Sequence, residues 1–271
     1  MHPADATLED MTEQNYMFNT AETGEHQRLL AHAQVWDPVT FRRLKSTGLG
    51  EGWRCLEVGA GSGTVTEWLA EQVGHTGHVV ATDLETKWIR GLGSPNVDVV
   101  EHDIRTDQIG ESVYDLITLR LVMTHLPDKL AVLGKLGRAL VPGGWLLVED
   151  YDMRVLPVFE PPDATCSKVA GASAEAIRAG GGDPYLGAKL PGLLSAAGLT
   201  GVETEAVAFP RRMPAIRSWR TQVAEMRDRL VGAGLVSADE VDLVLARFDD
   251  EYCELVVYGP LLVSARGRRP A

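Results

Sequence analysis

The stretch CLEVGAGSG, residues 55–63, decides the fold of this chain. An apolar run reaches an acidic residue, and glycine then occupies every second position from 59 to 63. Residues 64–74, TVTEWLAEQVG, follow with apolar side chains at helical spacing and a glycine as the stop. We therefore predict a strand, a tight glycine turn and a helix. In an open α/β sheet such a turn lies at the carboxyl end of a strand, where ligands bind.

The spacing of the glycines bears on the ligand of this turn. Sites for dinucleotides use G-x-G-x-x-G and hold a pyrophosphate at the helix N-terminus. Here the third glycine comes one residue early, and Thr64 takes the sixth place. Glu57 stands two residues before Gly59, and a carboxylate there suits a cationic ligand better than a pyrophosphate. Taken alone, the motif also fits a bare glycine turn in another α/β protein.

The rest of the chain continues the alternation of strands and helices. Apolar runs predict strands over 78–83, 97–104, 114–120, 145–150, 202–209 and 260–265. Helices are expected over 86–92, 128–140, 164–179 and 188–197, with a turn at 141–144. Asp83 lies 24 residues after Gly59, which places it to accept hydrogen bonds from both hydroxyls of a ribose. A helix N-cap is the alternative role for Asp83.

These motifs resemble those of class I S-adenosylmethionine (SAM)-dependent methyltransferases. Residues 57–63 resemble the first motif of that family, residues 114–120 resemble the fourth, and the LVPGG turn at 140–144 is similar to another. The resemblance covers residues 55–150 and is to ubiquinone- or menaquinone-biosynthesis-like enzymes and to small-molecule methyltransferases of bacterial specialised metabolism. It implies an α/β, Rossmann-like sheet of seven strands with helices on both faces. The last strand is then antiparallel and lies between strands five and six.

The resemblance also implies SAM as the cofactor and a set of contacts to it. SAM carries a sulfonium, an ammonium and a ribose but no phosphate, in agreement with Glu57. Asp103 would hold the adenine amino group with Ile104 against the ring, and Arg120 would reach the methionine carboxylate or serve as a structural ion-pair partner. Tyr16 would contact the ligand from an N-terminal arm or anchor that arm to the core. The expected cofactor-binding residues are Tyr16, Glu57, Gly59, Ala60, Gly61, Asp83, Leu84, Asp103, Ile104 and Arg120.

Methyl transfer from a sulfonium is an in-line displacement that depends first on alignment. Proximity and orientation contribute roughly 7–11 kcal/mol, whereas a general base adds on the order of 10²–10⁴-fold. Candidates for a catalytic role are His125, Tyr151 and Asp152, with Asp150 and His26 as further candidates for a base. His125 also lies in an x-His-Leu element that resembles a structural feature of the family, in which the imidazole bonds to backbone. We favour that structural interpretation of His125.

The domain prediction is an N-terminal helical cap over 1–50 and a SAM-binding domain over 51–271 with lid insertions near 151–187 and 213–250. In the cap, one helix is expected from Gly24 to Trp36 and a second from Asp37-Pro38 to Ser46. The cap and the insertions are expected to roof a pocket for a small, largely apolar organic acceptor, with oxygen favoured over carbon or nitrogen as the methylated atom. Packing of the lid helices onto the sheet is the alternative role of their apolar residues. These residues are Met17, Phe18, Trp36, Met153, Val155, Leu156, Phe159, Trp219 and Met226.

Composition limits the class of protein. The chain has 271 residues, a net charge of −12 and a pI near 5.0, which argues against a nucleic-acid partner. No signal segment and no apolar run of membrane-spanning length is visible, so we expect a cytoplasmic protein without a membrane partner. Three widely spaced cysteines offer neither a disulfide framework nor a metal motif, and we expect no metal. Oligomeric state stays open, with a homodimer among the options.

Two other functions compete with methyl transfer. A SAM-binding protein of the same fold can use its pocket for cyclisation, rearrangement or regulatory binding, and it would keep the same cofactor residues. Release of S-adenosylhomocysteine (SAH) in the presence of an acceptor separates these two hypotheses. A nicotinamide-dependent oxidoreductase is disfavoured by the glycine spacing and by Glu57.

Overall fold

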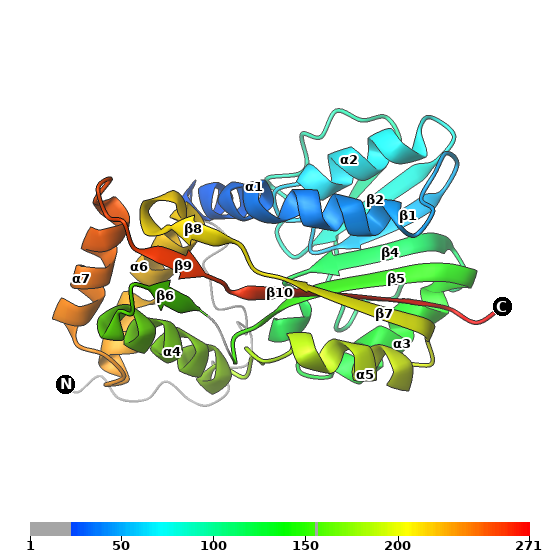
Figure 1. The fold of residues 1–271 in the computed structure, drawn as a ribbon. Helices are drawn as coiled ribbons and strands as arrows, with labels where there is room; N and C mark the ends of the chain where they lie inside the picture. The colour runs from blue at the N-terminus through cyan, green and yellow to red at the C-terminus, as the bar shows by residue number, and fades with distance from the viewer. Residues whose placement is uncertain (1–22, 155–156) are drawn as a thin grey trace, which may run out of the picture.

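The computed structural model describes residues 23–154 and 157–271, and a seven-stranded sheet forms its centre (Figure 1). The strand order is β3-β2-β1-β4-β5-β10-β7. The central strands pair in parallel, whereas β10 is antiparallel to both β5 and β7. The strands are β1 (Arg54–Val58), β2 (His78–Asp83), β3 (Val97–Glu101), β4 (Tyr114–Arg120), β5 (Leu140–Asp152), β7 (Thr200–Val207) and β10 (Leu261–Arg268). This topology confirms the predicted fold class.

Helices cover both faces of the sheet because its central strands are apolar on both sides. Alternate residues of β1 point to opposite faces. Cys55 packs in a core with Leu69 of α2 (Thr64–Val73), and Leu56 packs in a second core with Leu133 of α3 (Lys129–Ala139). The second core also contains Leu190 at the start of α5 (Leu190–Ala196).

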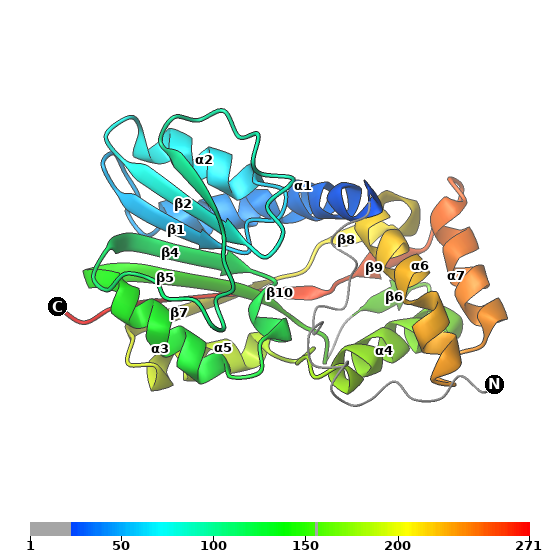
Figure 2. The ribbon, with the colours of Figure 1, turned by 180° about the vertical axis from the view of Figure 1, so that it is seen from behind.

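A second body of helices and strands lies beyond the carboxyl end of β5, and we call it the lid (residues 158–179 and 210–258). It contains α4 (Ala164–Ala179), α6 (Arg217–Gly232) and α7 (Ala238–Asp249), with a small sheet in the order β6-β9-β8. Those strands are β6 (Val158–Glu160), β8 (Pro210–Arg212) and β9 (Val256–Tyr258). The lid has its own hydrophobic core. Figures 1 and 2 show α1 (Thr23–Lys45) reaching from the lid to α2, and α1 contacts both α6 and α2.

The prediction of two N-terminal helices was wrong, because α1 continues through Pro38 as a single helix. Asp37 does not cap a new helix, since its carboxylate instead accepts a hydrogen bond from Arg120 at 2.8 Å (Nη2 to Oδ1). Trp36 and Val39 are buried against Leu262 of β10. A proline inside a helix costs about 3 kcal/mol, and this tertiary packing offsets that cost.

Smaller differences concern turns and short elements. Residues 86–92 form turns rather than the predicted helix. β5 begins at Leu140, so the predicted turn at 141–144 lies within its first residues. β3 ends at Glu101, and the helix expected over 188–197 divides into the 3-10 helix η2 (Gly187–Lys189) and α5. Two further 3-10 helices are η1 (Met123–His125) and η3 (Met213–Ala215). The small sheet of the lid was not predicted.

Candidate active site

A cavity of about 770 Å³ lies where β1, β2, β4 and β5 end, between the sheet, α1 and the lid. Its volume is within the roughly 300–1,000 Å³ of sites for small molecules and cofactors. Its wall includes nine of the predicted cofactor residues: Glu57, Gly59, Ala60, Gly61, Asp83, Leu84, Asp103, Ile104 and Arg120. Tyr16, the tenth, lies outside the described residues, as do Met17, Phe18, Val155 and Leu156.

Two glycines of the turn have conformations that a side chain would oppose. Gly59 has a φ of 73°, and a Cβ at this position would lie 2.3 Å from Cγ2 of Val122. Gly61 has a φ of 55°, and its backbone N–H donates to Oδ2 of Asp83 at 2.8 Å. The N–H of Gly59 donates to the carbonyl of Thr82 at 2.7 Å. The turn is therefore bonded to the end of β2, which fixes the Asp83 carboxylate at the cavity.

Glu57 is a buried carboxyl group at the base of the cavity. The residue is 6% exposed and accepts a hydrogen bond from the hydroxyl of Thr66. Burial raises the pKa of Glu57 to about 8. None of the salt bridges among residues 23–154 and 157–271 involves Glu57. A cationic ligand would therefore meet a carboxyl group that no described salt bridge occupies, although the charge of Arg120 also acts on it.

Asp83 and Asp103 differ in their electrostatic surroundings. Burial raises the pKa of Asp83, although backbone N–H groups including that of Gly61 donate to its carboxylate. The hydrogen bonds from Arg105 hold the pKa of Asp103 below its usual value. Nη2 of Arg105 lies 2.7 Å from Oδ2 of Asp103, and both residues line the cavity. Ile104 and the half-exposed Leu84 provide apolar surface beside these carboxylates.

The end of β4 combines an ion pair with an unusual backbone. Arg120 donates to Oδ1 of Asp37 and to Oγ1 of Thr40, each at 2.8 Å, so it is a structural ion-pair partner that also lines the cavity. Leu121 follows with a φ of 58°, in the left-handed region that bulky residues rarely adopt. Such strain is found at active sites and ligand clamps. The Leu121 N–H donates to the carbonyl of Glu149 at 2.8 Å, which helps to hold this conformation.

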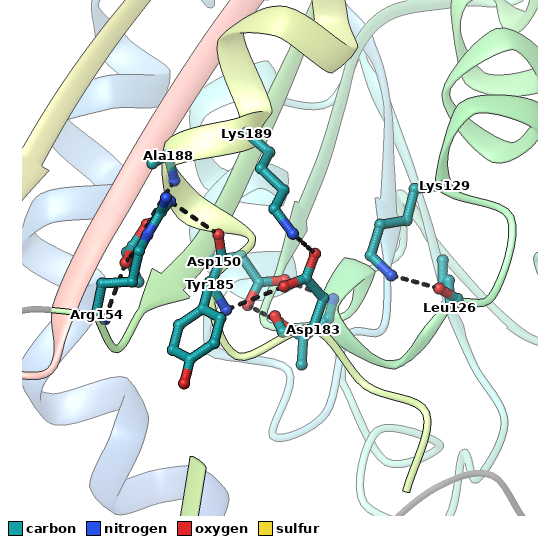
Figure 3. A network of polar contacts seen from close by, with 10 residues as sticks. Leu126, Lys129, Asp150, Arg154, Asp183, Tyr185, Ala188 and Lys189 are labelled. Atoms are coloured by element: carbon teal, nitrogen blue, oxygen red, sulfur yellow. Dashed lines mark hydrogen bonds and ion pairs between the residues drawn. The ribbon is translucent and has the colours of Figure 1, made fainter. Parts of the chain in front are cut away.

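Two of the three candidates for a catalytic role line the cavity, and the third does not. His125 and Tyr151 line the cavity, and burial lowers the pKa of His125 to about 4. Asp152 does not line the cavity: its carboxylate accepts hydrogen bonds from Arg154 and from the backbone N–H of Ala188 at 2.9 Å. Figure 3 labels these two donors. In a regular strand residues 150 and 152 point to the same face, so these hydrogen bonds, and not the alternation of the strand, account for the absence of Asp152 from the cavity wall.

Asp150 lies in the cavity wall next to Tyr151. Its carboxylate accepts hydrogen bonds from the backbone N–H and the hydroxyl of Thr124, at 2.9 and 2.6 Å. Burial raises the pKa of Asp150 to about 6. The hydroxyl of Thr124 also lies 3.3 Å from the carbonyl oxygen of Asp183, so Thr124 connects the end of β5 to the loop after α4. Asp150 and Asp183, the two residues that it connects, are labelled in Figure 3. His26 is not among the cavity residues, and its ring stacks on Trp88 with centroids 4.5 Å apart.

Of the apolar residues expected to line an acceptor pocket, four of the five that the structure describes do not line the cavity. Phe159, Trp219 and Met226 are buried in the core of the lid, and Trp36 packs between α1 and the sheet. Met153 alone of the described residues in that set lines the cavity. The lid contributes Ile177 of α4 and two polar side chains of α6, Gln222 and Arg229. This part of the wall is therefore more polar than expected.

Sequence reasoning missed the cavity residues of α1. Arg28 and Glu25 are both buried there, with Nε and Nη2 of Arg28 each 2.6 Å from a Glu25 oxygen. His32 lies one turn further along the helix and also lines the cavity. The spacing of positions 25, 28, 32 and 36 along one helix face was the signal for this surface, but nothing local to these residues shows which ligand site they meet.

Neither a cluster of metal ligands nor a membrane-spanning helix is found among residues 23–154 and 157–271. No group of three or more His, Cys, Asp or Glu side chains in them could hold a metal ion. None of their helices has both the length and the apolar character needed to cross a membrane.

The chain is similar in sequence to known methyltransferases. Residues 24–204 match the family described as "Methyltransferase domain". Two methyltransferases of the fungus Strobilurus tenacellus are similar: str3 at 28% identity over 80% of each chain, and str2 at 32% identity over 70% of each chain. A demethylmenaquinone methyltransferase of Staphylococcus saprophyticus is 28% identical over 51% of this chain and 62% of its own.

Among solved structures, a phosphoethanolamine N-methyltransferase 2 of Haemonchus contortus in complex with SAM has a similar fold. The TM-score is 0.57 at 14% identity, over 91% of this chain and 57% of that one. At this identity the likeness concerns the fold, and it agrees with the strand order described above.

Proposed function

Since the chain belongs to the SAM-dependent methyltransferases, we propose that it transfers the methyl group of SAM to a hydroxyl oxygen of a small organic acceptor held between the sheet and the lid. The observation that carries this proposal is the continuous cavity. It reaches from Glu57 and Asp83 at the sheet to Ile177, Gln222 and Arg229 of the lid. One cavity therefore has room for a donor and an acceptor side by side.

The residues at the sheet end fit SAM. Glu57 is a buried carboxyl group that takes part in none of the described salt bridges, which suits the ammonium of SAM, and Asp83 is held by the glycine turn where it can accept from ribose hydroxyls. Asp103 would accept from the adenine amino group with Ile104 and Leu84 against the ring. Arg120 would add positive charge near the methionine carboxylate while keeping its bond to Asp37. When bound, SAM supplies an electrophilic methyl group that needs no further activation.

The chain's own contribution is chiefly alignment, because none of the candidate bases is well suited to remove a proton from a weakly acidic hydroxyl. The imidazole of His125, with its pKa near 4, is a weak base, and the Asp150 carboxylate is occupied by hydrogen bonds from Thr124. Burial raises the pKa of Tyr151, so its phenol stays protonated. A phenolic or enolic hydroxyl, which ionises more readily than an alcohol, is the acceptor group that this site serves best.

The acceptor is proposed to have an apolar body with a polar end. Leu29, Met153 and Ile177 provide apolar wall, and Gln222 and Arg229 lie two turns apart on α6. Apolar lining with a few placed polar groups is typical of small-molecule sites.

The test is to incubate the purified protein with SAM and a panel of phenols and hydroxyquinones, and to measure SAH release and the position of the new methyl group by NMR. We expect an O-methyl product from at least one phenol or enol. Asp83→Ala is the matched control and should weaken SAM binding at least tenfold, because ribose hydroxyls lose their charged acceptor. C- or N-methyl products only would contradict O-methylation. A substrate converted without SAH release would support the non-transfer alternative.

A further inference from the structure

Three side chains from α1 and β5 form a hydrogen-bonded chain beside the cavity. Nε1 of Trp36 lies 2.8 Å from the hydroxyl oxygen of Tyr151, and that oxygen lies 3.2 Å from Nδ1 of His32. His32 and Tyr151 both line the cavity, whereas Trp36 is buried behind them. The contacts join residues more than 100 positions apart, so they depend on how α1 packs on the sheet.

The direction of these hydrogen bonds follows from which groups can donate. An indole N–H can only donate, so the Tyr151 oxygen accepts from Trp36. Among the described residues, Nδ1 of His32 is the one hydrogen-bond partner of this hydroxyl that is able to accept its proton, so we assign the accepting role to Nδ1. A neutral imidazole has one N–H, and with Nδ1 accepting, that N–H is on Nε2.

Nε2 of His32 is a buried atom that has no hydrogen-bond partner in the described part of the chain. In the imidazole ring Cε1 separates this Nε2 from Nδ1. The side chain of His32 lines the cavity. Burial, together with the positive charges of Arg28 and Arg120, lowers the pKa of His32 to about 3. The ring therefore stays neutral and offers a donor, not a base.

We propose that the Nε2–H of His32 donates a hydrogen bond to an oxygen of the methyl acceptor and so selects acceptors that carry a carbonyl in addition to the methylated hydroxyl. This rests on the proposed function, since it assumes that the acceptor occupies this cavity. The Nε2–H has no partner among the described residues of the free protein, so an acceptor oxygen that reaches it adds a hydrogen bond, which favours such acceptors by on the order of tenfold.

The first measurement needs no substrate. Long-range ¹H–¹⁵N NMR of histidine-labelled protein distinguishes the two neutral tautomers, and His32→Gln identifies the signal of residue 32 among the 7 histidines. We expect His32 to have its proton on Nε2 throughout pH 6–9. A proton on Nδ1 would overturn the proposal, because Nε2 would then accept rather than donate. In Trp36→Phe, which removes only the fixed donor, we expect a mixture of the two tautomers.

The second measurement uses a pair of probes matched in shape, 4-hydroxybenzophenone and 4-benzylphenol, which differ by one carbonyl. In the presence of saturating SAH, we expect wild-type protein to bind the benzophenone about tenfold more tightly. His32→Leu should lose this preference, and His32→Gln, which keeps an N–H donor, should retain part of it. Equal binding of the two probes by the wild type, or binding of neither, would overturn the selection. Failure of the proposed function is distinct, since it would appear as absence of SAH release with every hydroxylated acceptor.

Discussion

At the scale of single residues, the cavity is distinguished by carboxyl groups whose surroundings differ. Burial raises the pKa of Glu57 and of Asp83, whereas Arg105 lowers that of Asp103. Buried carboxyl groups outside salt bridges are suited to a cationic or hydroxyl-bearing ligand, and a carboxylate with an arginine partner stays ionised. The three carboxyl groups predicted to bind SAM therefore differ in charge state, and each is proposed to contact a different group of SAM.

Because the pKa of Glu57 is raised, we expect SAM binding to release a proton. At pH 7 the free group is mainly protonated because its pKa is about 8, and the ligand's ammonium would lower that pKa and favour the carboxylate. Because a proton leaves on binding, the affinity for SAM should rise with pH up to about 8. Titration of Glu57 accounts for at most a tenfold rise in affinity per pH unit. Calorimetric titration at pH 7 in buffers of different ionisation enthalpy measures the released proton.

Glu57→Gln is the matched control for proton release, since it keeps the shape and removes the titration. It should abolish most of the release and weaken SAM binding. Equal proton release by the variant and the wild type would show that another group titrates.

At the scale of elements, the lid is held by a core of its own. Trp219 of α6 is 9% exposed and packs against Phe159 of β6 and Phe248 of α7, with ring centroids 5.8 and 5.5 Å away. These contacts join α6, α7 and the small sheet. The aromatic residue therefore serves packing of the lid, which was the alternative to an acceptor contact.

Trp219→Ala is expected to lower the free energy of unfolding of the lid by about 3–5 kcal/mol, the usual cost of removing a large buried aromatic side chain. Tyr252→Ala is the control, because Tyr252 is 88% exposed and should change stability by less than about 0.5 kcal/mol. Urea unfolding followed by circular dichroism measures both variants. A loss below about 1 kcal/mol for Trp219→Ala would contradict a packing role.

At the scale of the whole molecule, the sheet and the lid have separate hydrophobic cores and meet around one cavity. The groups proposed to bind SAM belong to the sheet end, and the lid contributes only Ile177, Gln222 and Arg229 to the cavity wall. Binding of a ligand to one body stabilises that body first, so the two should respond to different ligands.

Hydrogen exchange tests this division. With SAH at 100 times its Kd, mass action provides about 2.7 kcal/mol, and opening of the turn at 57–63 and of residues 83–85 should be suppressed by roughly 100-fold. Amides of α4 and α6 should change little until an acceptor is added. Equal slowing of α6 by SAH alone would show that the cofactor orders the lid directly.

Much of the fold could be predicted because it depends on local pattern. Apolar runs ending at Glu57 and Asp83 mark strands, the glycines mark the turn, and parallel strands place their carboxyl ends at one edge of the sheet. That geometry is why residues 57, 83 and 103 line one cavity. Periodicity reports the backbone of each segment, and it was sufficient to locate the seven strands, whereas the place of the last strand between strands five and six came from the family resemblance.

Tertiary packing decided what local pattern does not record. Pro38 lies inside a helix because Asp37 pairs with Arg120, and Asp152 leaves the cavity because Arg154 and Ala188 bind its carboxylate. The bond from Trp36 to Tyr151 and onward to His32 joins two segments that no short-range signal connects. The physical reason is the same in each case: a side chain's partner depends on which distant element packs against it, and neighbouring residues in the sequence carry no information about that element.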